Sequence, residues 1–192
     1  MMVSFAAVIL AGGAATRLGG RDKPALPVQG QPMLHRVLAA VEHAEQRIVV
    51  GPRRGGLPRD VLTTSERPPG GGPVAATAAG LDLVTVDLVA LLAADLPYLT
   101  ADAIERLIAG VDDSVDGALF LDDAGRRQLL CGVWHTRALH RVLDDLGDPS
   151  GRSMRALFDR LDIRELTVPT GDGPPPWFDC DTEEDLKEAH RR

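Results

Sequence analysis

The chain has 192 residues with 28 acidic and 21 basic side chains, which gives a formal net charge of −7. A chain of this length can bury about 70% of its unfolded surface in one core, so we predict a single domain over residues 1–192. The acidic balance argues against general binding to nucleic acid or to a membrane surface, because both need a basic face. Two cysteines, Cys131 and Cys180, are too few for a disulfide framework, and they predict a cytoplasmic protein.

Apolar runs and breaker residues predict strands that alternate with helices. Residues 3–11 are continuously apolar, too short a run to cross a membrane, and typical of a buried parallel strand. In chain order, the further predicted strands are 47–50, 61–64, 87–94, 117–121, 128–134 and 163–168. The predicted helices are 31–45, 74–83, 100–110, 136–146, 153–161 and 182–190. This alternation predicts an α/β sandwich around a mostly parallel, mixed sheet, with ligands outside the carboxyl ends of the strands.

The loop after the first predicted strand combines glycines with cations. It begins with Gly12 and Gly13 and carries Arg17, Arg21 and Lys23. Glycines let backbone amides approach an anion closely, and the three cations add positive charge. The spacing matches neither a Walker loop nor the G-x-G-x-x-G fingerprint. We interpret the loop as a triphosphate cradle, and the alternative is a simple turn with solvated cations.

Three aspartates are candidates for metal binding. Asp95 follows the strand 87–94, and a carboxylate at a strand end can bind magnesium together with substrate phosphates and water. The alternative for Asp95 is a role in a turn. Asp179 and Asp181 straddle Cys180, so both carboxylates share one face of an extended segment, and Asp181 is a second candidate ligand. The alternative is that Asp181 or Thr182 caps the last helix.

Two further segments have weaker signals. Gly70, Gly71 and Gly72 precede a helix of small residues whose N-terminus could face a ligand, although a surface loop has the same composition. Residues 150–155 form a basic helix start that could hold the phosphate of a second substrate, although exposed arginines are common in this chain. The sequence contains no H-E-x-x-H and no G-x-S-x-G motif, so neither zinc chemistry nor acyl transfer is indicated.

Several of these residues together resemble a known family. The segments Leu10-Ala11-Gly12-Gly13, Arg17, Gly20 and Asp22-Lys23-Pro24 resemble the L-A-G-G-x-x-x-R-x-G-x-x-K signature of nucleotidyltransferases with the Rossmann-like GT-A fold. Residues 72–73, 94–98 and 179–186 extend the similarity over essentially the whole chain. Together, these further segments narrow the resemblance from the nucleotidyltransferases in general to the molybdenum cofactor guanylyltransferase family, the MobA type.

The resemblance implies transfer of GMP from magnesium-bound GTP to the phosphate of molybdopterin, with release of pyrophosphate. It implies that Asp95 binds Mg²⁺, and we expect Arg17 and Lys23 to neutralise phosphates during catalysis. The residues then expected to contact the nucleotide are Leu10, Ala11, Gly12, Gly13, Lys23, Gly51, Glu66, Gly72 and Asp95. The family's guanine-contacting asparagine falls at Gly51, and its closing N-x-N-T-P-E-D motif is Asp-Cys-Asp-Thr-Glu-Glu-Asp here, which adds negative charge near the metal.

Two other functions stay open at this point. Because Gly51 replaces the asparagine, a cytidylyl- or sugar-phosphate nucleotidyltransferase on the same fold is the nearest alternative. A nucleotide-binding module without turnover is the alternative from another class. We expect a monomer or weak oligomer whose ligands are GTP and molybdopterin or the molybdenum cofactor. Further expected partners are proteins that deliver or accept the cofactor, in transient contacts.

Overall fold

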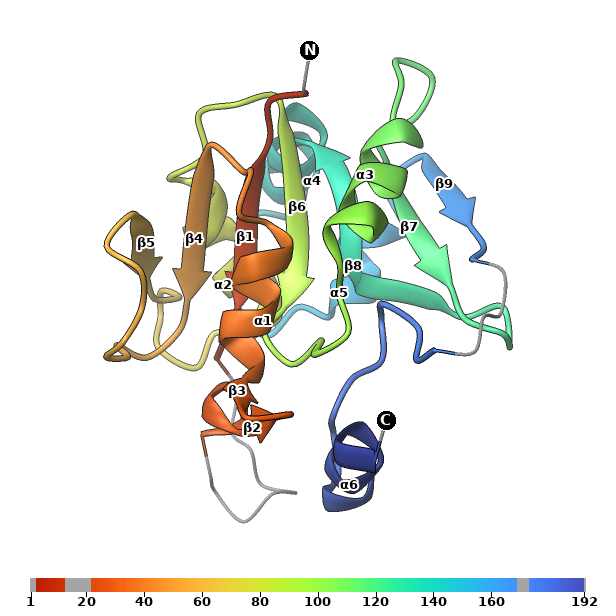
Figure 1. Ribbon diagram of the computed structural model, residues 1–192. Coiled ribbons are helices and arrows are strands. Elements are labelled where there is room, and N and C mark those ends of the chain that lie inside the picture. Colours follow the sequence, from red (N-terminus) through yellow and green to blue (C-terminus); the bar gives the residue numbers. More distant parts are fainter. Residues whose placement is uncertain (1–2, 13–21, 169–172, 192) are drawn as a thin grey trace.

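The computed structural model describes residues 3–12, 22–168 and 173–191, and it confirms the predicted α/β architecture (Figure 1). A seven-stranded sheet has the order β5-β4-β1-β6-β8-β7-β9. Its strands are β1 (Ala6–Leu10), β4 (Gln46–Val50), β5 (Val61–Thr64), β6 (Leu88–Ala93), β7 (Gly117–Leu121), β8 (Arg127–His135) and β9 (Ile163–Leu166). The helices are α1 (Met33–Ala40), α2 (Pro73–Leu81), α3 (Ala101–Ala109), α4 (Thr136–Leu146), α5 (Met154–Phe158) and α6 (Glu183–Arg191).

The sheet is mixed, with one strand running against the other six. β1 pairs in parallel with β4 and with β6, and β4 pairs in parallel with β5. β8 is antiparallel to both β6 and β7, and β9 is parallel to β7. The carboxyl ends of β5, β4, β1 and β6 therefore lie along one edge of the sheet.

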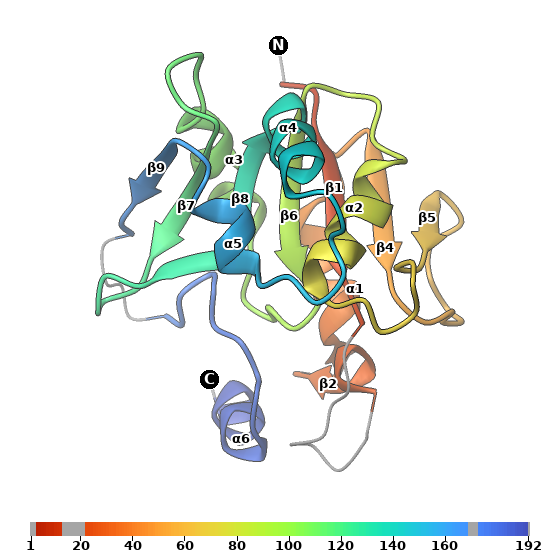
Figure 2. The same cartoon turned by 180° about the vertical axis from the view of Figure 1, so that it is seen from behind.

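Helices cover both faces of the sheet. α1 and α3 lie on one face (Figure 1), and α2, α4 and α5 lie on the other (Figure 2). Each face has its own hydrophobic cluster: Ala7 and Ile9 of β1 belong to the first, and Val8 and Leu10 belong to the second. Because β1 is buried on both sides, its sequence is apolar without alternation.

Helix α2 packs unusually close to the sheet through Gly80. A Cβ atom at this position would overlap Val8 Cγ1 and lie 3.0 Å from Val50 Cγ2. Glycine therefore lets the helix approach the middle of β1 and the end of β4. This contact positions the N-terminal end of α2, and the glycine loop before it, beside the carboxyl edge of the sheet.

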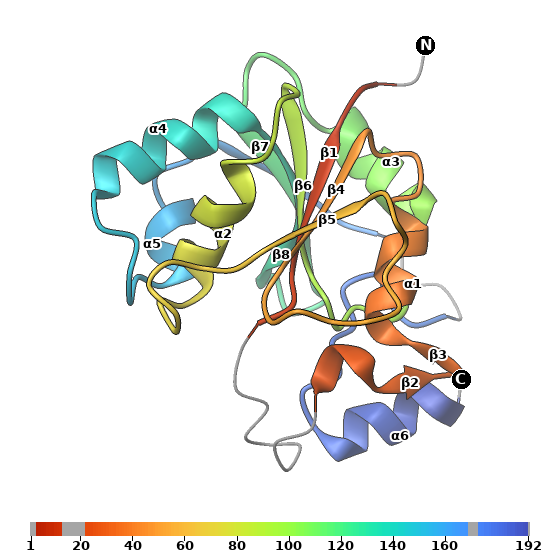
Figure 3. The same ribbon diagram turned by 90° about the vertical axis from the view of Figure 1, so that its left-hand side faces the viewer.

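A small second layer forms beyond that edge. The hairpin of β2 (Pro27–Val28) and β3 (Gln31–Pro32) lies beside α6 there (Figure 3). The predicted helix over 31–45 was therefore too long. Residues 31–32 form strand β3 of the hairpin, and helix α1 ends at Ala40. The predicted helix 153–161 is also shorter, since α5 ends at Phe158.

Within the described residues, no helix is both long enough and apolar enough to cross a membrane.

Candidate active site

The loops after the parallel strands leave the sheet side by side. The backbone N–H of Ala11 donates to the carbonyl of Val50 at 2.8 Å, so β1 and β4 stay paired up to the point where the chain leaves the sheet. The N–H of Gly51 donates to the carbonyl of Thr64 at 2.9 Å, and the N–H of Ala94 donates to that of Leu10 at 3.1 Å. The sequence-predicted rim is therefore one continuous surface.

Gly51 lies directly beneath the first loop. Its φ of +150° is rarely adopted by other residues, and a Cβ atom would lie 2.8 Å from the carbonyl carbon of Ala11 and 2.9 Å from the amide nitrogen of Gly12. All three nearest atoms belong to the backbone, which cannot move aside as a flexible side chain could. On this backbone, an asparagine at position 51 does not fit, so any reading of a nucleobase must come from another residue.

Lys23 lies between two carboxylates at the rim. It opens the short 3-10 helix η2 (Lys23–Ala25), and its Nζ pairs with Asp95 Oδ2 and donates to Asp181 Oδ1 at 2.6 Å. The side chains of Lys23 and Asp95 are 16% and 17% exposed. Burial by itself would lower the pKa of Lys23, but the two carboxylates outweigh it and raise that pKa. Lys23 is therefore a fixed positive charge at the end of β6.

The side chain of Cys180 sets the direction of its two neighbours. Cys180 is fully buried in the small cluster between the hairpin and α6, whereas Asp179 and Asp181 are exposed. Thr182 begins α6: its N–H and hydroxyl donate to Asp185 Oδ2 at 2.7 Å, and Asp185 N–H donates back to Thr182 Oγ1 at 3.1 Å. Because Thr182 and Asp185 cap the helix, Asp181 is left to bind Lys23.

The acidic side chains near Lys23 fit a divalent cation that arrives with its own oxygen ligands. Partial desolvation raises the pKa of the solvent-accessible Asp179, and the negative charges of Asp181 and Asp95 raise it further. Within the described residues, no three acidic, histidine or cysteine side chains are arranged as a complete metal site. Magnesium commonly uses only one or two protein carboxylates and completes its shell with phosphate and water. Asp95 and Asp181 match that requirement.

Arg54 is a rim residue that the sequence reasoning missed. Its Nε and Nη2 donate to the two carboxylate oxygens of Asp22 at 3.0 and 2.6 Å, and Nη2 also donates to the carbonyl of Ala11 at 2.7 Å. The Arg54 side chain is only 11% exposed. One guanidinium thus ties together the two ends of the cationic loop. The available signal was an arginine shortly after β4, at the edge where its fork can match a carboxylate.

A cavity of about 530 Å³ opens at this rim, within the size range of about 300–1,000 Å³ usual for small-molecule sites. Glu66 lines it, with Oε1 accepting a hydrogen bond from the N–H of Gly70 at 3.2 Å. Gly72 also lines it and has a φ of +88°, which favours glycine before α2. The cavity is lined by the predicted residues Leu10, Gly12, Lys23, Glu66, Gly72 and Asp95, together with Pro24, Gly70, Pro73, Ala76, Ala93, Ala94 and Leu130.

Several predicted site residues lie elsewhere. Ala11 and Gly51 are packed beside this cavity and are not part of its lining, and Asp181 reaches the rim through Lys23. Gly13, Arg17 and Arg21 lie outside the described residues.

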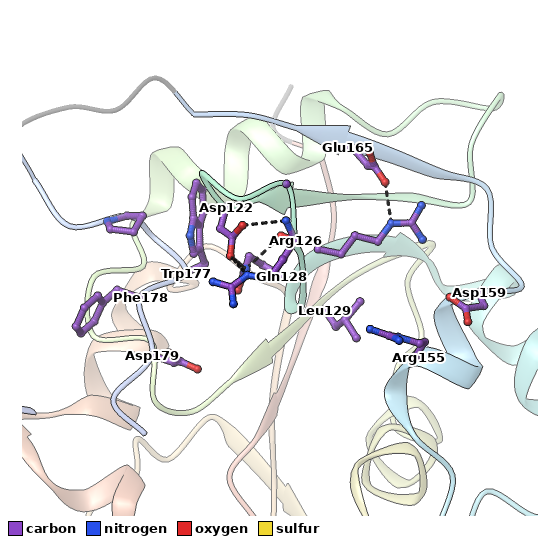
Figure 4. A pocket seen from close by; sticks show the side chains of 13 residues that line it. Asp122, Arg126, Gln128, Leu129, Arg155, Asp159, Glu165, Trp177, Phe178 and Asp179 are labelled. Carbon is purple, nitrogen blue, oxygen red and sulfur yellow. Dashed lines mark hydrogen bonds and ion pairs between the residues drawn. The ribbon is translucent and has the colours of Figure 1, made fainter. Parts of the chain in front are cut away.

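A second cavity, of about 850 Å³, lies between the β7–β8 hairpin, α5 and the segment before α6 (Figure 4). Asp179 points into it from one side, and Arg155 from α5 points into it from the other. Trp177 forms part of its wall and packs against Phe120 with ring centroids 5.2 Å apart. The same wall carries Arg126, which is paired with a carboxylate of the hairpin.

A mixed sheet whose glycine-containing rim carries a fixed lysine and clustered carboxylates is suited to bind a nucleotide and its phosphates on a Rossmann-like fold. The family comparison agrees. The chain belongs to the family of the MobA-like NTP transferase domain, whose sequence profile matches residues 7–165, and it is therefore a nucleotidyltransferase.

Relatives and solved structures agree with this assignment. The chain is 31% identical to a molybdenum cofactor guanylyltransferase of Rhodobacter capsulatus, over 98% of this chain and 96% of that protein. Its fold is similar to the molybdopterin-guanine dinucleotide biosynthesis protein A of Archaeoglobus fulgidus, with a TM-score of 0.71, 18% identity and 97% of each chain covered. It is also similar to a 4-diphosphocytidyl-2C-methyl-D-erythritol synthase of Anaerococcus prevotii, with a TM-score of 0.69, 13% identity, and 98% and 97% covered. The fold alone therefore does not select a base.

Proposed function

We propose that this enzyme transfers GMP from GTP to the phosphate of molybdopterin and releases pyrophosphate, with Mg²⁺ as the required metal. The supporting observation is the Lys23–Asp95–Asp181 cluster: Lys23 and Asp95 line a nucleotide-sized cavity, and Asp179, two residues before Asp181, lines a second, larger cavity. The name of the Rhodobacter relative, at 31% identity over nearly the full length, supports the choice of substrates.

In this reaction an oxygen of the acceptor phosphate forms a bond to the α-phosphorus of GTP. The bond from that phosphorus to the bridging oxygen breaks, and the electron pair leaves with pyrophosphate. The protein needs no nucleophile, because catalysis of this kind depends on positioning and on neutralising charge. Asp95 and Asp181 would hold Mg²⁺, which when bound supplies positive charge to phosphate oxygens.

Lys23 and the first loop have the complementary role. Lys23 would donate from Nζ to oxygens of the departing pyrophosphate, and Arg17 would add a second positive charge there. Arg54 would keep the end of the loop at Asp22 next to Ala11, so that Lys23 stays at the end of β6. The ammonium is already charged and partly desolvated, and it would exchange Asp95 and Asp181 for phosphate oxygens as these two carboxylates bind Mg²⁺.

Glu66 supports guanine as the base. An ionised carboxylate only accepts hydrogen bonds, and the Watson–Crick edge of guanine offers two adjacent donors, N1–H and N2–H. Cytosine and adenine present one amino donor beside a ring-nitrogen acceptor, which a carboxylate repels. Glu66 lines the cavity of about 530 Å³, which we call the nucleotide cavity. Its Oε2 faces Gly12: a Cβ atom added to Gly12 would lie 3.9 Å from this oxygen. Glu66 would then recognise the base in place of the family's asparagine, for which the backbone around position 51 leaves no room.

The proposed function is tested by measuring pyrophosphate release from GTP, CTP and ATP, each with molybdopterin and with a sugar 1-phosphate as acceptor. We expect release only with GTP and molybdopterin. A preference for CTP or for a sugar phosphate would establish the alternative nucleotidyltransferase. Nucleotide binding without pyrophosphate release from any pair would establish a binding module.

The metal assignment is tested by Asp95→Asn. Loss of this carboxylate should lower magnesium-dependent kcat by roughly 10²- to 10³-fold, as expected when one charge-stabilising group is removed from a phosphoryl-transfer site. Asp82→Asn is the matched control, because Asp82 is exposed at the end of α2 and does not line either cavity. If Asp95→Asn keeps half or more of the magnesium-dependent rate, Asp95 is not the metal ligand.

A further inference from the structure

The two cavities lie on either side of one reaction centre. Leu129 lines the larger cavity and Leu130 lines the nucleotide cavity, and these residues are neighbours on β8. On the other side, Asp179 lines the larger cavity, while Asp181 binds Lys23 at the rim of the nucleotide cavity. A ligand in either cavity therefore has one end near the carboxylate cluster. An in-line transfer between two substrates requires this arrangement.

Two of the three arginines that line the larger cavity are already paired. Arg126 Nε contacts Asp122 Oδ2 at 2.7 Å, and Arg127 Nε contacts Glu165 Oε1 at 2.7 Å. Arg155 is different: among the described residues, its guanidinium has neither an ion pair nor a hydrogen bond. It points into the cavity beside Leu129 (Figure 4).

An uncommitted guanidinium in a cavity is suited to one kind of ligand. Its planar fork matches two oxygens of a phosphate group and stays charged at all physiological pH values. Arg155 faces the cavity from the side opposite Asp179 (Figure 4). A phosphate between them would be bound on one side by Arg155 and would lie toward the carboxylate cluster on the other. Trp177 and Leu129 add apolar surface to a lining that is otherwise mostly polar, and they would face the rest of the ligand.

We propose that the larger cavity binds the acceptor substrate, a planar heterocycle with a phosphate ester, and that Arg155 binds its phosphate. This inference rests on the proposed function and adds to it the acceptor site and its phosphate-binding residue. Arg155 lies on α5, outside the signature loop and the closing aspartate motif. Its role is to hold the attacking phosphate, so it acts on acceptor affinity and not on GTP affinity.

The test is a double cycle that pairs a protein variant with a ligand variant. The probes are 6-hydroxymethylpterin phosphate and the same pterin without phosphate. Both are titrated into the protein with Mg²⁺ and α,β-methylene GTP present, so that no transfer occurs, and binding is followed by isothermal titration calorimetry. Arg155→Gln removes the charge, and Arg160→Gln is the control, because Arg160 is exposed just beyond α5 and does not line the cavity.

We expect the wild-type protein to bind the phosphorylated pterin about 10- to 100-fold more tightly than the unphosphorylated one, which corresponds to hydrogen bonds with a charged group. Arg155→Gln should remove most of that difference and leave the affinity for the unphosphorylated pterin unchanged. Arg160→Gln should bind both pterins as the wild type does. With molybdopterin as acceptor, Arg155→Gln should raise the acceptor KM while the KM for GTP stays the same.

Two results would overturn the inference. One is that Arg155→Gln still distinguishes the two pterins as the wild type does, and the other is that Arg160→Gln loses the distinction equally. These results differ from a failure of the proposed function. If the wild type does not transfer GMP to molybdopterin at all, the proposed function is wrong. If it does transfer GMP and Arg155→Gln still distinguishes the two pterins as the wild type does, only the assignment of this cavity is wrong.

Discussion

Replacement of Gly51 tests how the strand ends build the nucleotide site. In Gly51→Ala, the new Cβ would be 2.8–2.9 Å from three backbone atoms of Ala11 and Gly12, closer than any ordinary contact. Overpacking of this kind costs about 1–3 kcal/mol, and a side chain forced to a φ of +150° adds about 1–3 kcal/mol. Together they remove about 2–6 kcal/mol of the ~5–15 kcal/mol typical of a native protein. At about 2–4 °C per kcal/mol, the melting temperature should fall by roughly 5–20 °C.

Gly56→Ala is the matched control for that experiment. Gly56 lies in the same loop with a φ of +79°, but a Cβ there would have no atom within 4 Å. Its cost is therefore only the left-handed conformation, about 1–2 kcal/mol. The measurements are urea unfolding and the KM for GTP, which should rise in Gly51→Ala because the Ala11–Gly12 backbone is displaced. If Gly51→Ala is no less stable than Gly56→Ala, the close approach inferred for the first loop is wrong.

Two further predictions concern the rim and the core. Arg54→Gln should lower the free energy of unfolding by about 1–3 kcal/mol and raise the KM for GTP, because it removes the two hydrogen bonds from the guanidinium to Asp22. Arg53→Gln is the exposed control. If urea unfolding and kinetics show the same change in both variants, Arg54 does not hold the loop in place. Burial raises the pKa of the Cys131 thiol from 9.0 to about 12. Near pH 9 this proton is therefore released only by the unfolded chain. The free energy of unfolding should then fall as pH rises from about 9 to about 12. In unfolding measured across that range, Cys131→Ala should show a shallower fall, and a slope equal to that of the wild type would show that the thiol is not the cause.

The parts of the fold that depend on local pattern were predictable. β1 and β6 are apolar because the sheet is covered on both faces, and the position of Asp95 follows from the end of β6. The β2–β3 hairpin was missed, because each of its strands has only two residues and its stability depends on packing against α6. Short segments of this kind have no periodicity to detect.

For the site, the sequence predicted which residues reach the rim but not which ones bind each other. The Lys23–Asp181 contact joins residues 158 positions apart, and the alternative that Asp181 caps α6 was excluded only by the capping pair of Thr182 and Asp185. The restriction at Gly51 arises from the backbone of a neighbouring strand end, which no local pattern encodes. Long-range geometry therefore decided the details of the site.

The burial of Cys180 has a consequence for how the protein is made. Its side chain fastens the segment with Asp179 and Asp181 to the small cluster that α6 completes with the hairpin. During synthesis the nucleotide-binding loops leave the ribosome before these carboxylates, which lie more than 80 residues after Asp95. Asp181 can join Lys23 only after α6 has docked on the hairpin, so a nascent chain that has not yet released α6 has the nucleotide loops without the complete carboxylate cluster.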